Sequence, residues 1–326
     1  MSISKGVFKI KKFDLAIIGA GPVGLFSANY AQLHGLKTII FDSLNEIGGQ
    51  PQMLYPFKEI ADIPVFDKIT AHQLISHLKS NLNKLTTIEK NHRVVKIEKI
   101  DTTFTIDNTF SVKAIIIATG NGAFNPKKFP VKMATEAEEK VHYYIKDPKA
   151  FTNQHVGIFG GGDSALDWAL ELTKNCSVSL IHRRDNFRGL ESNVEKLKGL
   201  KNVEILTPYL PKNAELDDNQ LKIGLKKVGT DELIYKKFDQ IIVAYGFRAN
   251  NRFVKDWGVN LEDSHIKVES EMRTNIPGIY AVGDAVTYSG RVPIIGVGFG
   301  EAQIAINAIM RNLFPEKTLT IHSTSL

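Results

Sequence analysis

The stretch that decides the fold is FDLAIIGAGPVG, residues 13–24. An apolar run with strand character leads directly into G-x-G-x-x-G, formed by Gly19, Gly21 and Gly24. A helical pattern of apolar residues follows, and a second apolar run, TIIFD, covers residues 38–42. This order of strand, glycine turn, helix and strand predicts a dinucleotide-binding unit. Its glycines allow a tight turn, approach of the backbone to a pyrophosphate and close packing of helix on strand.

Asp42 ends the second of these runs. A carboxylate at this position can accept hydrogen bonds from an adenosine ribose, while the pyrophosphate lies at the helix N-terminus. Asp42 is therefore a candidate ribose-binding residue. The alternative is a solvated carboxylate at a strand end.

The pattern repeats later in the chain, in HVGIFGGGDSA, residues 155–165. Gly160, Gly162 and Ala165 form G-x-G-x-x-A, and another helical run and another strand follow. Two such units predict an α/β protein with two Rossmann-like dinucleotide-binding domains, the second inserted into the first. The expected boundaries are residues 1–122 with 249–326 for the first domain and 123–248 for the second.

The residue after the second strand differs between the two copies. The spacing that leads from Gly19 to Asp42 leads from Gly160 to Arg183, inside HRRDNFR. Guanidinium groups bind phosphate oxygens through two parallel charge-assisted hydrogen bonds, which suits the 2′-phosphate of NADP. The sequence therefore predicts NADP at the second site, bound by Arg183, Arg184 and Arg188. A solvated basic loop is the alternative.

Composition excludes several classes of protein. The chain has 326 residues, 43% of them hydrophobic and 23% charged, which is enough apolar material for two packed domains rather than a disordered chain. Its one cysteine, Cys176, cannot form an intrachain disulfide, a CxxC redox pair or a multi-cysteine metal site. We expect no metal.

The net charge of +6 is spread along the chain without a basic arm or a nucleic-acid-reading module, so no nucleic-acid partner is expected. The first residues lack the apolar core of a secretory signal, and no apolar run approaches the ~18 residues that span a bilayer. We therefore expect a cytoplasmic protein without a membrane partner.

Two further strand ends point to the first cofactor. AIIIATG covers residues 114–120, and TNIPGIYAVGD covers residues 274–284. Both resemble fingerprints of the two-dinucleotide-binding flavoproteins, in which the Gly-Asp carboxylate contacts the ribityl and pyrophosphate region of FAD. The resemblance implies FAD at the first site and makes Asp284 a candidate contact.

Over nearly its whole length the chain resembles the thioredoxin-reductase-like class of ferredoxin–NADP reductase. The resemblance is carried by seven motifs: GGQP (48–51), YP (55–56), TGNGAF (119–124), GGGDSA (160–165), HRR (182–184), AYGF (244–247) and HSTSL (322–326). It implies a homodimeric flavoenzyme with FAD and NADP as cofactors.

The resemblance also assigns residues to FAD. Aromatic rings at Tyr55 and His322 would sandwich the flavin, and the backbone at Val95 would bind the adenine. The remaining implied FAD contacts are Asp42, Gln50, Phe124, Asp284 and Thr324.

The implied reaction passes a hydride from the nicotinamide to the flavin and then single electrons to ferredoxin or flavodoxin, so no protein nucleophile is required. Thioredoxin reductase instead uses a CxxC pair, which this chain lacks. Two alternatives stay open: an NAD(P)H oxidase or small-acceptor reductase of the same fold, and a flavoprotein redox sensor without catalysis.

Overall fold

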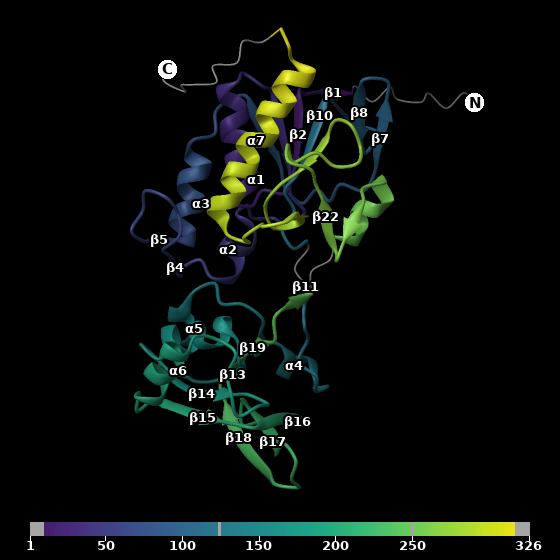
Figure 1. Cartoon of the computed structure of the whole chain (residues 1–326). Coiled ribbons are helices and arrows are strands. Elements are labelled where there is room, and N and C mark those ends of the chain that lie inside the picture. Colours follow the sequence, from purple (N-terminus) through teal and green to yellow (C-terminus); the bar gives the residue numbers. More distant parts are fainter. Residues whose placement is uncertain (1–9, 123–124, 249–250, 317–326) are drawn as a thin grey trace, which may run out of the picture. The chain divides into compact units, whose positions relative to one another are not determined.

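The computed structural model describes residues 10–122, 125–248 and 251–316. The chain divides into two compact units, each drawn in Figure 1. Unit 1 comprises Met1–Gln52, Pro56–Ala123 and Ala249–Leu326, and unit 2 comprises Met53–Tyr55 and Phe124–Arg248. The chain therefore leaves the first unit and returns to it.

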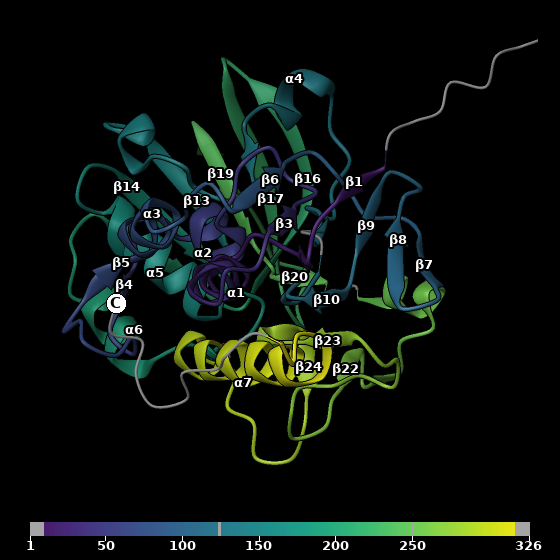
Figure 2. The ribbon, with the colours of Figure 1, turned by 90° about the horizontal axis from the view of Figure 1, so that it is seen from above.

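Unit 1 is built on a five-stranded sheet in the order β23-β10-β2-β3-β6, with every pair parallel. Helices α1 and α3 lie on one side of this sheet, and strands β7–β9 lie on the other (Figures 1 and 2). The elements are β2 (Leu15–Ile18), α1 (Pro22–Leu33), β3 (Thr38–Phe41), α3 (Ala71–Ser80), β6 (Thr86–Glu89), β10 (Ala114–Ile117), β23 (Ile279–Ala281) and α7 (Ile295–Leu313).

All residues of β2, β3 and β10 are buried. Continuous apolar strands are typical of a parallel sheet covered on both faces. A second sheet, β1-β9-β8-β7, adds Phe104 and Phe110 to the same core. Its strands and the smaller elements of this unit are β1 (Lys11–Lys12), β7 (Ile97–Ile100), β8 (Thr103–Ile106), β9 (Phe110–Val112), α2 (Gly49–Leu54), β4 (Glu59–Ile60), β5 (Ile69–Thr70), η2 (Arg252–Trp257), β21 (Leu261–Glu262), β22 (His265–Lys267), η3 (Gly283–Ala285) and β24 (Val286–Thr287).

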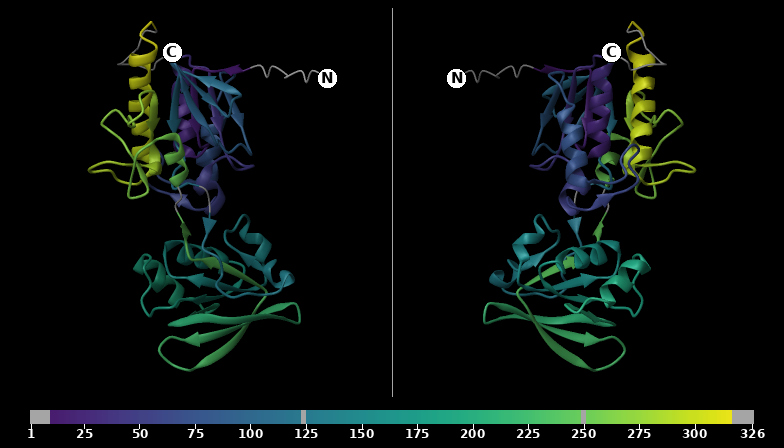
Figure 3. Two further views of the ribbon diagram at one scale, coloured as in Figure 1. Left: turned by 90° about the vertical axis from the view of Figure 1, so that its right-hand side faces the viewer. Right: turned by 90° about the vertical axis from the view of Figure 1, so that its left-hand side faces the viewer.

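Unit 2 repeats the parallel sheet in the order β12-β19-β13-β14-β15. A three-stranded antiparallel sheet, β16-β17-β18, packs its β17 side chains against β13 and β19 and lies below the parallel sheet in Figure 3. The elements are β11 (Asn125–Pro126), α4 (Thr135–Glu138), β12 (Val141–His142), η1 (Pro148–Phe151), β13 (His155–Gly160), α5 (Asp163–Leu172), β14 (Ser177–Ile181), α6 (Glu191–Lys198), β15 (Val203–Leu206), β16 (Tyr209–Asp217), β17 (Gln220–Lys227), β18 (Leu233–Phe238), β19 (Gln240–Ala244) and β20 (Phe247–Arg248).

The repeat read from the sequence is present in three dimensions. The strand that leads into the glycine turn is the central one in both units, β2 between β10 and β3, and β13 between β19 and β14. The predicted α/β class with two Rossmann-like units is confirmed. Within the described ranges, no helix is both long and apolar enough to cross a bilayer.

Replacement of Gly24 by alanine should destabilise unit 1. A Cβ at Gly24 would lie 1.9 Å from the backbone oxygen of Gly19, which cannot move without breaking the turn. Overpacking of this kind costs about 1–3 kcal/mol, measurable as a lower free energy of unfolding in urea.

The matched control is Gly300→Ala in α7, where no atom lies within 4 Å of the added Cβ. It should leave stability unchanged or raise it by up to about 1 kcal/mol, because alanine is the better helix former. Equal stability of the two variants would contradict the steric argument.

Candidate functional site

The first glycine turn lies at the carboxyl end of β2. Gly19 has φ +110°, a conformation that other residues rarely adopt, and a Cβ there would lie 2.4 Å from the Ala118 oxygen. Gly21 is the N-cap of α1 and Pro22 begins the helix. The backbone therefore reaches the helix N-terminus without a side chain in the way, as a bound pyrophosphate requires.

Asp42 is buried directly beneath this turn. One carboxylate oxygen accepts the Ala20 N–H at 2.7 Å and the other accepts the Leu44 N–H at 2.9 Å. Burial raises the pKa of Asp42, although both hydrogen bonds oppose that shift. Asp42 thus fixes the glycine turn itself, a role that the sequence pattern does not predict, and its contact with a ribose stays a prediction.

Gln50 is brought to the same turn by the glycines before it. The Gly48 N–H donates to the Ala20 oxygen at 2.8 Å. A Cβ on Gly49 would lie 3.0 Å from the Gly21 Cα, so the two backbones approach each other closely. Gln50 follows in α2, next to the N-terminus of α1.

Asp284 lies on the other flank of α1. It sits in the short turn η3 directly after Gly283, whose φ is +72°. A Cβ on Gly283 would lie 3.4 Å from the Val23 side chain in the first turn of α1. Gly19, Gly21, Gly24, Asp42, Gln50 and Asp284 are therefore gathered at one edge of the sheet.

The backbone of Val95 lies close to this edge, but its N–H and its carbonyl oxygen each already form a hydrogen bond within the protein. The preceding segment is tied to it, because the His92 N–H donates to the Asp42 backbone oxygen at 2.8 Å. The Val95 N–H donates to Asp107 Oδ1 at 3.1 Å, and the Val95 oxygen accepts the Trp257 Nε1–H at 3.0 Å. Any adenine contact at Val95 would therefore use the remaining lone pair of its carbonyl.

Four expected FAD residues cannot be joined to this group. Phe124, His322 and Thr324 lie outside the described residues. Tyr55 follows α2 and is grouped with unit 2. Flavin stacking by Tyr55 and His322 stays a prediction.

The second glycine turn is built like the first. A Cβ on Gly160 would lie 2.6 Å from the Ala244 oxygen and 2.9 Å from the Ala165 Cβ, so β13, β19 and α5 pack without space for a side chain. Gly162 is the N-cap of α5 and has no other atom within 4 Å of a Cβ position. The start of α5 is thus open to an anion, and the residues fit a dinucleotide pyrophosphate.

The loop that carries Arg183, Arg184 and Arg188, called the arginine loop below, is hydrogen-bonded to this turn through its backbone. The Arg188 N–H donates to the Gly161 oxygen at 2.7 Å, and the Leu190 N–H donates to Asp163 Oδ1 at 2.9 Å. Arg183, Arg184 and Arg188 are exposed, and no carboxylate of the described residues forms an ion pair with them. Their guanidinium groups are available for an anionic ligand.

His182 is buried between the arginines and the glycine turn. Its ring stacks on Phe187, and a Cβ on Gly161 would lie 2.4 Å from it. Burial, with the charges of Arg183, Arg188 and Arg184, lowers the pKa of His182. The ring is therefore neutral at neutral pH and fills the space beneath the loop.

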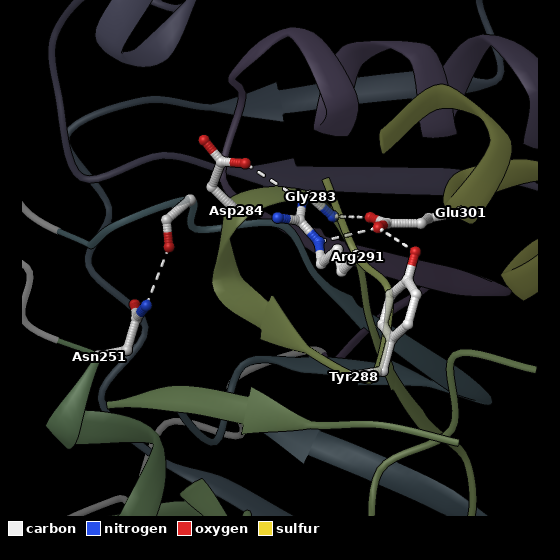
Figure 4. A network of polar contacts seen from close by, with 7 residues as sticks. Asn251, Gly283, Asp284, Tyr288, Arg291 and Glu301 are labelled. Carbon is white, nitrogen blue, oxygen red and sulfur yellow. Dashed lines mark hydrogen bonds and ion pairs between the residues drawn. The ribbon is translucent and has the colours of Figure 1, made fainter. Parts of the chain in front are cut away.

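A polar network that the sequence motifs do not predict lies behind Asp284. Glu301 binds the Gly283 N–H and Arg291, and Arg291 binds Asp284 (Figure 4). One sequence signal could have revealed it: Glu301 is a charged residue within the apolar stripe of the α7 helix.

Comparisons with known proteins agree with this geometry. The model of the pyridine nucleotide-disulphide oxidoreductase family matches residues 13–310. A protein of Lactobacillus acidophilus named ferredoxin–NADP reductase is 64% identical over 304 residues, 93% of this chain and 98% of the relative. One of the same name from Lactobacillus helveticus is 61% identical over 310 residues, 95% of this chain and all of the relative.

Among solved structures, thioredoxin reductase of Lactococcus lactis is similar with a TM-score of 0.76 and 30% identity. The match covers 92% of this chain and 98% of that one. These matches confirm the resemblance that the motifs carry.

The lowered pKa of His182 predicts a pH dependence of stability. The unfolded chain binds a proton near the ordinary value of 6.5, whereas the folded chain binds it only at lower pH. Acidification through this window therefore favours the unfolded state, by at most about 1.4 kcal/mol per pH unit. Urea unfolding at several pH values should show the free energy of unfolding falling below pH ~6.5.

The variant His182→Gln should flatten this slope. An unchanged slope in His182→Gln would show that another group causes the dependence.

Proposed function

Because the chain belongs to the pyridine nucleotide-disulphide oxidoreductase family, we propose that it is a flavoenzyme transferring electrons between NADPH and ferredoxin or flavodoxin. The observation that carries the proposal is the pair of glycine-turn units with opposite charges after the second strand, Asp42 in one and the arginine loop in the other. Two nucleotides of different chemistry fit these two units. The proposed electron acceptor, ferredoxin, is inferred from the names of the relatives.

The cofactors are FAD and NADP(H). We assign FAD to unit 1, where the start of α1 would hold the pyrophosphate and Asp284 a hydroxyl of the ribityl region. The close approach of Gly21 and Gly49 leaves backbone rather than side chains to face the cofactor. When bound, FAD accepts two electrons from NADPH and can release them one at a time.

NADPH is assigned to unit 2. The open N-terminus at Gly162 suits the pyrophosphate, and the exposed guanidinium groups of Arg183, Arg184 and Arg188 suit the 2′-phosphate. The neutral His182 ring supports the loop without adding a fourth cation.

Cys176 offers no route for electrons. It is buried, its Sγ–H donates to the Phe151 oxygen at 2.9 Å, and burial raises the pKa of the thiol. A thiol held in its protonated form is a poor nucleophile, and no second cysteine is present. The protein therefore supplies position and electrostatics, and the acceptor takes electrons without a protein disulfide.

An acidic carrier protein is compatible with the net charge of +6. Four lysines of the β16–β18 sheet have their charge offset locally, since Lys222, Lys226, Lys227 and Lys237 each pair with a carboxylate. A homodimer, which the resemblance implies, and a cytoplasmic location, which the sequence predicts, both stay predictions.

Replacing Arg183 or Arg184 with alanine should raise the KM for NADPH about ten-fold or more, because a charge-assisted hydrogen bond contributes about 1.5–3 kcal/mol. The KM for NADH should hardly change, since NADH has no 2′-phosphate. Steady-state kinetics with both donors measures the difference. Lys201→Ala, at an exposed lysine before β15, is the control, and an equal effect on NADPH and NADH would remove the arginines from the site.

The variant Cys176→Ala should keep the wild-type rate of ferredoxin reduction by NADPH. The assay is anaerobic, with the bound flavin and the ferredoxin followed by absorbance. Failure of NADPH to bleach the flavin of the wild-type chain would refute the proposed donor. Oxidation of NADPH only after oxygen is admitted, with no reduction of ferredoxin before it, would favour an oxidase. Loss of ferredoxin reduction in a folded Cys176→Ala would instead indicate a thiol step.

A further inference from the structure

Glu301 is a charged group in an apolar helix face, and its side chain is 2% exposed. Its carboxylate accepts three hydrogen bonds: from the Gly283 N–H at 2.6 Å, the Tyr288 hydroxyl at 2.9 Å and Arg291 Nε–H at 2.9 Å. A buried carboxylate is tolerated only when it is paired and hydrogen-bonded in this way. All three partners are donors, so the site requires a group that only accepts.

Arg291 joins this buried carboxylate to a second one at the surface. Its Nη2–H donates to Asp284 Oδ1 at 3.1 Å while its Nε–H is held by Glu301 (Figure 4). The side chain of Arg291 is 8% exposed, whereas that of Asp284 is 42% exposed. The guanidinium group is therefore fixed from behind, and Asp284 is the end of the network that a ligand can reach.

The Arg291 guanidinium lies between two carboxylates, and its position affects how unit 1 can bind an anionic ligand. A free carboxylate beside the start of α1 would repel a diphosphate held there, and the cation next to Asp284 offsets that charge. The bond to Oδ1 also restricts the rotamers of Asp284 and leaves Oδ2 for a hydroxyl donor. Glu301 in turn fixes both Arg291 and the backbone of Gly283.

We propose that Glu301 and Arg291 are positioning residues that hold the Asp284 carboxylate and offset its charge, and thereby set the affinity of unit 1 for FAD. This inference rests on the proposed function, in which unit 1 binds FAD. Neither residue contacts the reacting atoms in this assignment.

Three substitutions separate the parts of the network. Glu301→Gln introduces an amide N–H₂ where three donors converge, so at least one bond must break. Arg291→Lys keeps the charge but lacks the planar fork that binds two carboxylates at once. Tyr288→Phe removes one donor and leaves the link between Arg291 and Asp284 intact.

The test measures the FAD dissociation constant of each full-length variant, from the fluorescence of FAD released on dilution of the holoprotein. We expect Arg291→Ala and Glu301→Gln to weaken binding about ten-fold or more, Arg291→Lys to weaken it less, and Tyr288→Phe to weaken it less than about three-fold. The control Glu204→Gln, at a carboxylate paired with Lys236 in unit 2, should bind FAD as the wild type does.

A double-mutant cycle separates positioning from general damage to the fold. If Arg291 acts through Asp284, Arg291→Ala should weaken FAD binding far less in an Asp284→Asn background than in the wild type. Additive effects would overturn the proposal, as would wild-type affinity in Arg291→Ala. If Glu301→Gln fails to fold, Arg291→Lys and the cycle still decide. A wild-type chain that binds no FAD refutes the proposed function instead.

Discussion

The approach of backbone to backbone at the glycine turns is the constraint on which both units depend. At Gly24 and at Gly160 a single methyl group would overlap a carbonyl oxygen of the neighbouring chain segment. Only without side chains there can the helix pack directly on the central strand and direct its N-terminal N–H groups at the edge of the sheet. The rest of each site is arranged around that edge.

The two units fix the same turn by different means, and the difference suits their ligands. In unit 1 the buried Asp42 carboxylate holds the turn by accepting hydrogen bonds from two backbone N–H groups. In unit 2 the backbone N–H of Arg188 and the ring of His182 hold the turn, because both contact Gly161. The guanidinium groups therefore stay at the surface, where a phosphate can reach them. The same backbone geometry thus carries opposite charge at equivalent positions.

On the other flank of α1, the network of Asp284, Arg291 and Glu301 also places charges beside the start of the helix. An exposed carboxylate beside an anion-binding helix terminus is electrostatically unfavourable unless a cation accompanies it. That cation is itself nearly buried and needs a partner, which Glu301 provides. Arg291 thus holds Asp284, and Glu301 holds Arg291. Glu301 is the innermost group of the network, and its carboxylate accepts hydrogen bonds from three donors.

The sequence alone determined the two βαβ units, their glycine turns and the change from Asp42 to Arg183, because these features depend on residues close together in the chain. It also determined that a single cysteine excludes a dithiol relay. Tertiary structure alone decided that Asp42 binds the turn, that the Val95 N–H is committed to Asp107, and that Glu301 reaches Gly283. The physical reason is that hydrogen bonds to backbone groups across long sequence separations leave no periodic pattern, whereas glycine turns and buried strands do.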